Sequence, residues 1–188
     1  MALELKRRRF TAEEYHWMAR VGILGEDDRV ELVDGEIVEM TPIGHRHAAC
    51  VNRLAELFSQ TLGNTAIVSV QNPVRLGQYS EPQPDLALLR RKPDFYASGH
   101  PTPEDVFLIV EVAGSSVEPD RRVKIPLYAR SGVLEAWLVE LDQETLTVYR
   151  DPAPDGYHTV RVMRRGEQLA PAAFPSHSLA LTDIFPGS

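Results

Sequence analysis

The chain has 188 residues, of which 43% are hydrophobic, and this is enough for one domain with a buried core. Its formal net charge of -7 argues against a protein that coats nucleic acid through its overall charge, so any contact with DNA would need a local basic patch. The single cysteine excludes an internal disulfide and fits a reducing compartment. The first ten residues lack the features of a secretory signal, and no segment approaches the ~20 apolar residues of a membrane span, so we expect a cytoplasmic protein without a membrane partner.

The N-terminal part predicts a helix, a hairpin and a second, longer helix. Thr11 stands three residues before Glu14, which is the capping-box pattern at the start of a helix. Two alternating apolar runs over residues 30–40 are joined by Asp34 and Gly35, a dipeptide that favours a hairpin turn. Apolar residues at helical spacing then predict a helix over residues 45–62 that ends at Gly63.

The remainder predicts several strands and one more helix. Strand-like runs occupy residues 66–76, 84–90, 106–112, 133–142, 145–150 and 157–163. A polar, Pro-rich loop is expected over residues 91–105, and a helix over residues 118–132, in which Pro126 predicts a kink or a late start. This order of elements predicts a mixed α/β fold with a central sheet flanked by helices.

Glu111 interrupts the apolar run that begins at Val106, and its carboxylate needs an explanation. Burying an unpaired carboxylate costs several kcal/mol, which approaches the whole stability of a small domain. Asp85 stands at the start of another apolar strand, so the two carboxylates could meet at one end of a sheet and share a hard cation such as Mg²⁺, with Lys124 beside it. The alternative is a buried ion pair between Glu111 and Lys124 or an arginine, and the pattern alone favours neither reading.

A second group of candidate ligands lies at the start of the helix over residues 45–62. His45, His47 and Cys50 are of the types that bind soft metals, but the two histidines are two residues apart and would point to different faces of a helix. Four zinc ligands are not present in this segment, and no pattern there activates Cys50 as a nucleophile. We expect Cys50 in the core and His45 at the surface, while His47 could border a site formed elsewhere.

Arginines that follow two of the candidate site elements suggest phosphate contacts. Such clusters are most often a solvated face, but their position after site elements is where contacts to phosphate would be useful. The candidates are Arg90, Arg91, Arg121 and Arg122.

Four segments stand in a telling order along the chain: "ELVDGEIVEM" with "TPIGHRH", then "PQPDLALL", "LIVEVAGSS" and "DRRVKIPLYARSGVLEAWLVE". Taken in this order, they resemble the PD-(D/E)XK superfamily of restriction-endonuclease-like nucleases. More narrowly, they resemble its branch of small prokaryotic putative restriction endonucleases, in which the lysine is displaced to the following helix. The first segment resembles the N-terminal hairpin of that branch and the histidine that opens its first long helix, the second the PD motif, and the third the acidic strand with its serine-rich turn. The last resembles the lysine-bearing helix and the strand that follows, and it is the most specific of these segments.

The resemblance implies a single restriction-endonuclease-like domain over residues 1–188. Within it, residues 1–44 would form an N-terminal extension with the first helix and the hairpin, residues 45–150 the nuclease core, and residues 151–188 a C-terminal strand and tail.

The resemblance also implies the site residues. Asp85 and Glu111 would bind Mg²⁺ or Mn²⁺, with the backbone carbonyl of Val112 as a further ligand. The usual lysine position, two residues after the acid, holds Ala113, so Lys124 is the candidate lysine. The remaining candidates are Glu31 as a further catalytic residue, with His47 and Gln71 lining the site.

The implied activity is metal-dependent hydrolysis of DNA phosphodiester bonds by a homodimer with one active site for each strand. Two other readings stay open. The chain could be a catalytically silent dimeric module that binds nucleic acid or protein, or a metal-dependent hydrolase that acts on a different substrate.

Overall fold

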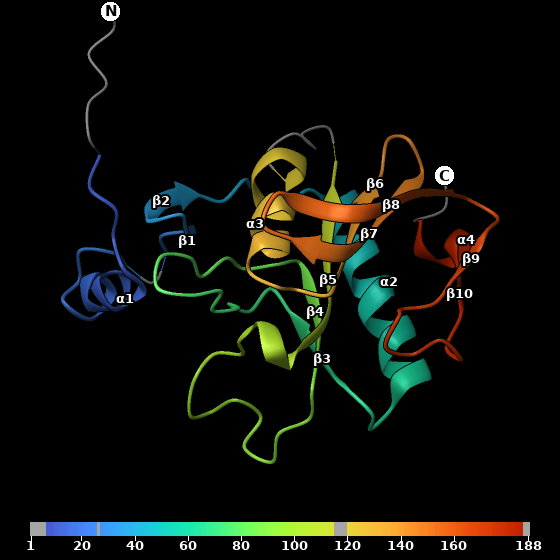
Figure 1. The fold of residues 1–188 in the computed structure, drawn as a ribbon, viewed down its shortest axis with the longest axis horizontal. Coiled ribbons are helices and arrows are strands. Elements are labelled where there is room, and N and C mark those ends of the chain that lie inside the picture. Colours follow the sequence, from blue (N-terminus) through green and yellow to red (C-terminus); the bar gives the residue numbers. More distant parts are fainter. Residues whose placement is uncertain (1–6, 26, 115–119, 186–188) are drawn as a thin grey trace, which may run out of the picture.

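A six-stranded mixed sheet with the order β3-β4-β5-β6-β7-β8 forms the centre of the fold (Figure 1). The computed structural model describes residues 7–25, 27–114 and 120–185. The strands of the sheet are β3 Ile67–Val70, β4 Leu86–Leu89, β5 Val106–Ala113, β6 Glu135–Glu140, β7 Thr145–Ala153 and β8 Gly156–Arg164. The β5–β6 pair is parallel and the other neighbouring pairs are antiparallel, as expected for an α/β domain built around a mixed sheet.

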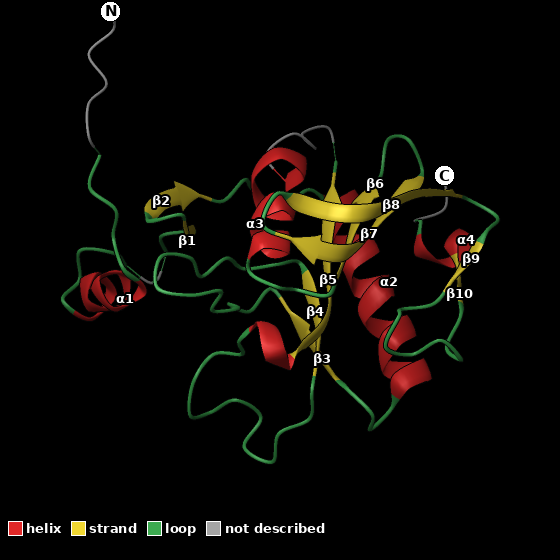
Figure 2. Ribbon diagram, viewed as in Figure 1, coloured by secondary structure: helices red, strands yellow, loops and turns green. Residues whose placement is uncertain are grey.

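Two helices cover opposite faces of this sheet (Figure 2). The helix α2 (His45–Leu62) packs on the side chains of Leu108, Val110 and Val112 of β5. The helix α3 (Ile125–Arg130) packs on Ile109 and Ala113, which alternate with them on the other face. Side chains along a strand point alternately to its two faces, so the strand position of Glu111 directs its side chain towards α3.

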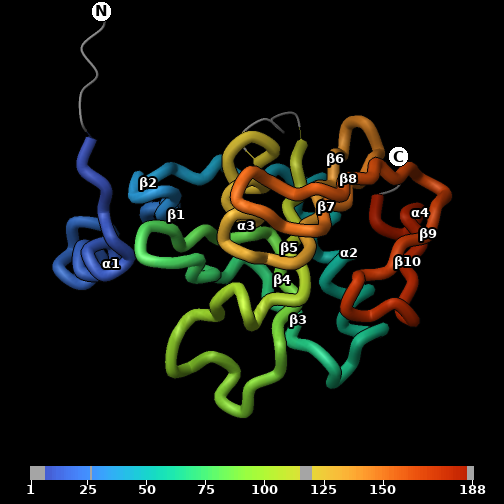
Figure 3. Tube along the Cα trace, in the orientation of Figure 1, coloured from blue at the N-terminus to red at the C-terminus, as the bar shows by residue number. Residues whose placement is uncertain are grey.

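The N-terminal helix and hairpin lie to one side of the sheet. The helix α1 (Ala12–Arg20) begins with the expected capping box of Thr11 and Glu14, and β1 (Val30–Val33) pairs with β2 (Glu36–Glu39). The long connection between β3 and β4 reaches this hairpin, as Figure 3 shows, and Leu32 of β1 forms a β-bridge with Glu81 there. The hairpin is therefore joined to the core through that connection.

The C-terminal part packs against α2. The strands β9 (Gln168–Leu169) and β10 (Leu179–Ala180) form a small antiparallel pair, and the short helix α4 (Leu181–Ile184) buries its apolar residues in the same core as α2. This part was expected to be irregular beyond β8. None of the helices in the described part of the chain is long and apolar enough to cross a membrane.

The structure confirms the predicted fold class and adjusts two elements. Residues 71–76 are not a strand, because Gln71 adopts a φ of 51° and ends the extended conformation of β3 at Val70. A helix was expected over residues 118–132, of which residues 118 and 119 lie outside the described residues. From residue 120 on, the structure has a π-helical turn over Asp120–Lys124, and α3 follows it. Pro126 stands in the first turn of α3, where the backbone N–H that proline lacks would have no partner within the helix. Of the two predicted effects of Pro126, the structure therefore shows the late helix start and not the kink.

Candidate functional site

A cleft of about 600 Å³ opens where β4 begins and β5 ends. The hairpin, the first turn of α2, the end of β3 and the π-helical turn before α3 complete its wall. The polar residues that line it include Glu31, His47, Gln71, Asp85, Glu111, Asp120 and Lys124. The structure thus brings together every residue that the sequence proposed as catalytic or site-lining.

Asp85 is held in one orientation by three donors from three segments. Its Oδ2 lies 2.9 Å from Nε2 of His47 on α2 and accepts a hydrogen bond of 2.8 Å from the backbone N–H of Val112 on β5. Its Oδ1 lies 3.5 Å from the amide Nε2 of Gln71, the weakest of the three contacts. Antiparallel pairing of β4 with β5 explains this arrangement, because it places the start of β4 beside the end of β5.

Glu111 is buried, with 2% of its surface exposed, and two polar groups contact it on the face of the sheet that α3 covers. Tyr128 of α3 donates a short hydrogen bond from its hydroxyl to Oε1, and Nζ of Lys124 lies 3.5 Å from the same oxygen. Lys124 and Tyr128 are four residues apart, so one turn of backbone presents both groups to the strand.

Lys124 connects Glu111 with the hairpin. Its Nζ lies 3.1 Å from Oε1 of Glu31, whose second carboxylate oxygen accepts a 2.9 Å hydrogen bond from the backbone N–H of Gln83. Glu31 is 5% exposed and the side chain of Lys124 is 14% exposed, so the ion pairs are shielded from water. The displaced lysine therefore lies beside Glu111, although it comes from a different element than in the usual pattern of the superfamily.

The electrostatics of the cleft favour positive charge. Burial, with the neighbouring acids Asp120 and Asp85, raises the pKa of Glu111 well above its usual value. Burial and the charges of Asp85 and Glu31 likewise raise the pKa of Asp120 to about 6. Burial opposes the charged form of Lys124, but Glu111, Glu31 and Asp120 outweigh it and raise the pKa of the lysine. The hydrogen bond with Asp85 raises the pKa of His47.

The cleft gathers oxygen donors of the type that a hard divalent cation takes, although among the described residues the group of three ligand atoms that lie within 4.8 Å of one another is outside it. Four carboxylates, those of Glu31, Asp85, Glu111 and Asp120, face a single lysine and a histidine that is already paired with Asp85. Oxygen ligands of this kind are those that Mg²⁺ and Mn²⁺ prefer. Val112 lines the cleft, and a ligand role for its carbonyl stays a prediction.

The predicted phosphate contacts lie elsewhere. Arg90 and Arg91 follow the end of β4 opposite to Asp85, on the order of 16 Å away at the usual rise of a strand. There Nε of Arg90 donates to the backbone oxygen of Glu104 at 2.8 Å, and its guanidinium stacks over Phe107. Arg121 pairs with Glu140 at 2.7 Å, and neither Arg121 nor Arg122 is among the residues that line the cleft. The arginines that do line it are Arg29 and Arg46.

Cys50 and His45 lie where the sequence predicted. Cys50 is fully buried in the core, and burial raises the pKa of its thiol to about 12, which leaves almost no thiolate near neutral pH. His45 is exposed at the first position of α2. Neither arrangement suits a cysteine–histidine nucleophile.

Sequence reasoning missed two residues of the cluster, Asp120 and Tyr128. A signal was present, because both stand four residues from Lys124, one on each side, which is the spacing of one helical face. Gln83 was also missed, and it acts through its backbone N–H, which no side-chain pattern could indicate.

Comparison with known proteins gives two matches. The family model Uma2, described as "Putative restriction endonuclease", matches residues 12–182. A crystal structure of a putative nuclease belonging to DUF820 from Anabaena variabilis ATCC 29413 superposes with a TM-score of 0.72 at 17% sequence identity, covering 94% of this chain and 97% of that chain. At that identity the likeness concerns the fold. Among curated proteins, none matches the chain significantly.

Proposed function

The chain belongs to the Uma2 family of putative restriction endonucleases, and from this premise we propose that it is a divalent-metal-dependent endonuclease that hydrolyses phosphodiester bonds of DNA. The membership agrees with the resemblance drawn from the ordered motifs. One observation carries the proposal beyond the family: Asp85, Glu111 and Lys124, which are far apart in the sequence, line one cleft. An accidental order of motifs would not be expected to bring them together.

Asp85 and Glu111 are the proposed ligands of Mg²⁺ or Mn²⁺, with the carbonyl of Val112 as a further candidate. A bound ion of this class would polarise the scissile phosphate and lower the pKa of a water molecule. His47 and the N–H of Val112 fix one oxygen of Asp85, and Tyr128 fixes one oxygen of Glu111, so both carboxylates are oriented before substrate arrives.

Lys124 is proposed to stabilise negative charge on the phosphate rather than to remove a proton. Its ammonium lies 3.1 Å from Glu31 and 3.5 Å from Glu111, and both carboxylates favour the charged form. A preorganised cation in a shielded cleft stabilises developing charge more strongly than it would in water. Glu31 is then the residue that positions Lys124.

Approach of DNA to this acidic cleft needs positive charge at its rim. Arg29 and Arg46 line the cleft, and Arg46 is held by Asp142 at 2.8 Å and by the carbonyl of Leu141 at 3.1 Å. A homodimer with one cleft for each strand is the assembly we expect, and sedimentation of the purified protein would test it.

Nicking of supercoiled plasmid in Mg²⁺ or Mn²⁺ tests the proposed activity. We expect wild type to cut, Lys124→Ala to cut about 100- to 1,000-fold more slowly, and Glu111→Ala to lose at least as much. Lys92→Ala is the matched control, since Lys92 also pairs with a carboxylate, Asp105 at 2.9 Å, but does not line the cleft.

Two results would contradict the proposal. Wild type that cuts no nucleic acid with either metal would favour the silent binding module. A Glu111→Ala variant that cuts as fast as wild type would mean that the site is wrongly assigned.

A further inference from the structure

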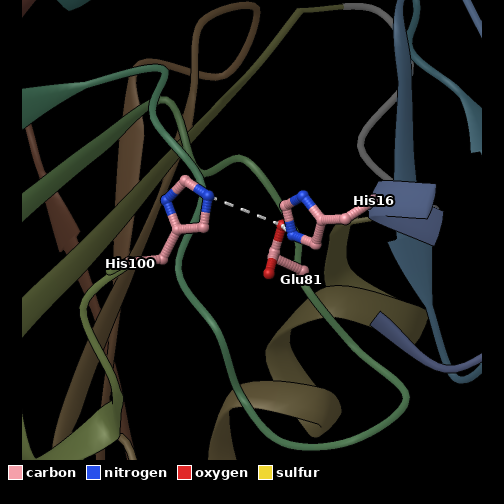
Figure 4. Close-up of side chains that lie close together, drawn as sticks. All are labelled: His16, Glu81 and His100. Atoms are coloured by element: carbon pink, nitrogen blue, oxygen red, sulfur yellow. Dashed lines mark ion pairs between the residues drawn. The ribbon is translucent and has the colours of Figure 1, made fainter. Parts of the chain in front are cut away.

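A second cluster of metal-binding side chains lies outside the cleft. His16 of α1, Glu81 of the β3–β4 connection and His100 of the loop before β5 each offer one ligand atom, and these atoms lie within 4.8 Å of one another (Figure 4). The Nε2 of His16 lies 2.8 Å from Oε1 of Glu81, and the Nε2 of His100 lies 3.8 Å from the same oxygen. The two imidazole rings are stacked, with centroids 5.6 Å apart and planes inclined by 20°.

Glu81 is the most constrained member of this cluster. Its side chain is 1% exposed, and its second oxygen, Oε2, is buried without a hydrogen bond from any described residue. A buried carboxylate with an unsatisfied oxygen is costly, and its histidine partners carry positive charge only when they are protonated. A bound cation would supply the positive charge that this buried carboxylate lacks, and two imidazole nitrogens stand beside it as further ligands.

We propose that His16, Glu81 and His100 form a second metal site that binds a zinc-class divalent cation. Neutral imidazole suits zinc and the neighbouring transition metals, whereas Mg²⁺ prefers oxygen ligands, so this site and the cleft select different ions. Two histidines and one glutamate are a known set of three protein ligands for zinc, with water as the fourth.

Two of the three ligand spacings need only a small adjustment for such a site, while the imidazole nitrogens of His16 and His100, which lie within 4.8 Å of each other, would have to approach further. Tetrahedral coordination at the usual zinc–nitrogen distance places ligand atoms about 3.4 Å apart. The 2.8 Å contact would lengthen and the 3.8 Å contact would shorten, each by about half an ångström. Both histidine side chains are 40% exposed, so they have room to move and to leave one position open to water.

The site would join three separate segments of the chain. The backbone N–H of Glu81 donates to the carbonyl of Leu32 at 2.8 Å, and Leu32 follows Glu31 on the hairpin. The hydroxyl of Tyr15, next to His16, donates to the carbonyl of Val30 at 3.0 Å. A bound ion would therefore fasten α1 and the hairpin to the core beside the strand that delivers Glu31 to the cleft.

Zinc titration of the full chain, stripped of metal with a chelator, tests this site. We expect wild type to bind one more equivalent of Zn²⁺ than either His16→Ala or His100→Ala. In each variant the affinity for that equivalent should fall by more than about 100-fold, because the loss of even an outer partner of a ligand costs about 10–100-fold. Any zinc that binds in the cleft binds to wild type and variants alike, so it does not contribute to the difference between them. Excess Mg²⁺ should leave this equivalent in place, and Co²⁺ should give the visible absorption of a four-coordinate ion.

His158→Ala is the matched control, because His158 is exposed and also pairs with a carboxylate, Asp155 at 3.0 Å, outside the cluster. It should keep the zinc stoichiometry of wild type. The two test variants come from different elements, and circular dichroism checks that each is folded. The proposal is overturned if wild type and both test variants bind zinc alike, or if Mg²⁺ displaces the equivalent that the variants lose.

Discussion

Glu111 is tolerated in an apolar strand because Tyr128 and Lys124 of another segment give its buried carboxyl group polar partners. The strand pattern alone left open whether it forms a structural ion pair or binds a metal, and the geometry joins the two readings. Lys124 lies 3.5 Å from its Oε1, as the ion pair required, and Asp85 lines the same cleft, as the metal site required. If the proposed function holds, the same ion pair stabilises the strand and orients a carboxylate for the metal.

Tyr128→Phe tests this role at the level of one hydroxyl. The change removes the donor to Glu111 and leaves the ring, so the pKa of Glu111 should rise further and the carboxylate should bind metal less readily. If the proposed function holds, the Mn²⁺ concentration for half-maximal nicking should increase about 10–100-fold, as for other partners of metal ligands. Unfolding in urea should show a loss of about 1–3 kcal/mol for the unsatisfied buried group.

Tyr157→Phe separates the metal effect from the loss of a buried hydroxyl in general. Tyr157 donates to the carbonyl of Val133 at 2.8 Å and does not contact Glu111. It should change stability without changing the Mn²⁺ requirement. Equal shifts of the Mn²⁺ requirement in both variants would count against a role for Tyr128 at the metal site.

At the scale of elements, the sequence predicted the helix ends and the hairpin turn, which depend on local pattern. The capping box at Thr11, the turn at Gly35 and the stop at Gly63 are local signals, and each lies where it was expected. Strand pairing is not local, and it alone places Asp85 beside Val112. The burial of Glu31 on the hairpin also depends on contacts that are distant in sequence. These contacts come from Glu81 and Gln83 of the β3–β4 connection, some 50 residues further along the chain.

The N-terminal arm, residues 7–11 before α1, explains why the hairpin turn needs a glycine. Gly35 has a φ of 81°, and a Cβ added there would lie 2.5 Å from the Cβ of Arg9. The backbone N–H of Phe10 donates to the carbonyl of Gly35 at 2.8 Å, and that of Gly35 donates to the carbonyl of Tyr79 at 2.6 Å. The turn therefore contacts both the arm and the β3–β4 connection.

Gly35→Ala should loosen this element while leaving the sheet intact. Strain of the left-handed backbone, with the clash at Arg9, should cost about 1–3 kcal/mol. Hydrogen exchange of β1 and β2 should accelerate accordingly, and that of β5 and β6 should not. Gly99→Ala is the control, since it has an ordinary φ and nothing within 4 Å of the added Cβ. Unchanged exchange in β1 and β2 of Gly35→Ala would show that the arm does not restrain the hairpin.

At the scale of the whole molecule, the distribution of charge sets how DNA can approach. The net charge is -7, and six acidic residues line the cleft against one lysine and two arginines. The arginine pair that follows β4 lies at the opposite end of that strand. A nuclease of this kind should therefore depend on its metal for binding DNA as well as for cutting it.

Binding of a labelled DNA duplex, measured by fluorescence anisotropy at several salt concentrations, tests this dependence. Without divalent metal we expect weak binding that changes little with salt, because few phosphates are contacted, and tighter binding once Ca²⁺ or Mg²⁺ is added. Asp85→Asn removes one negative charge and a proposed metal ligand. It should therefore bind DNA better than wild type without metal, by roughly fivefold for about 1 kcal/mol of repulsion, and should gain little from metal. Asp155→Asn makes the same change of net charge in the exposed turn between β7 and β8, outside the cleft, and should behave as wild type. Tight, steeply salt-dependent binding without metal would instead point to a basic surface remote from the cleft as the site of DNA contact.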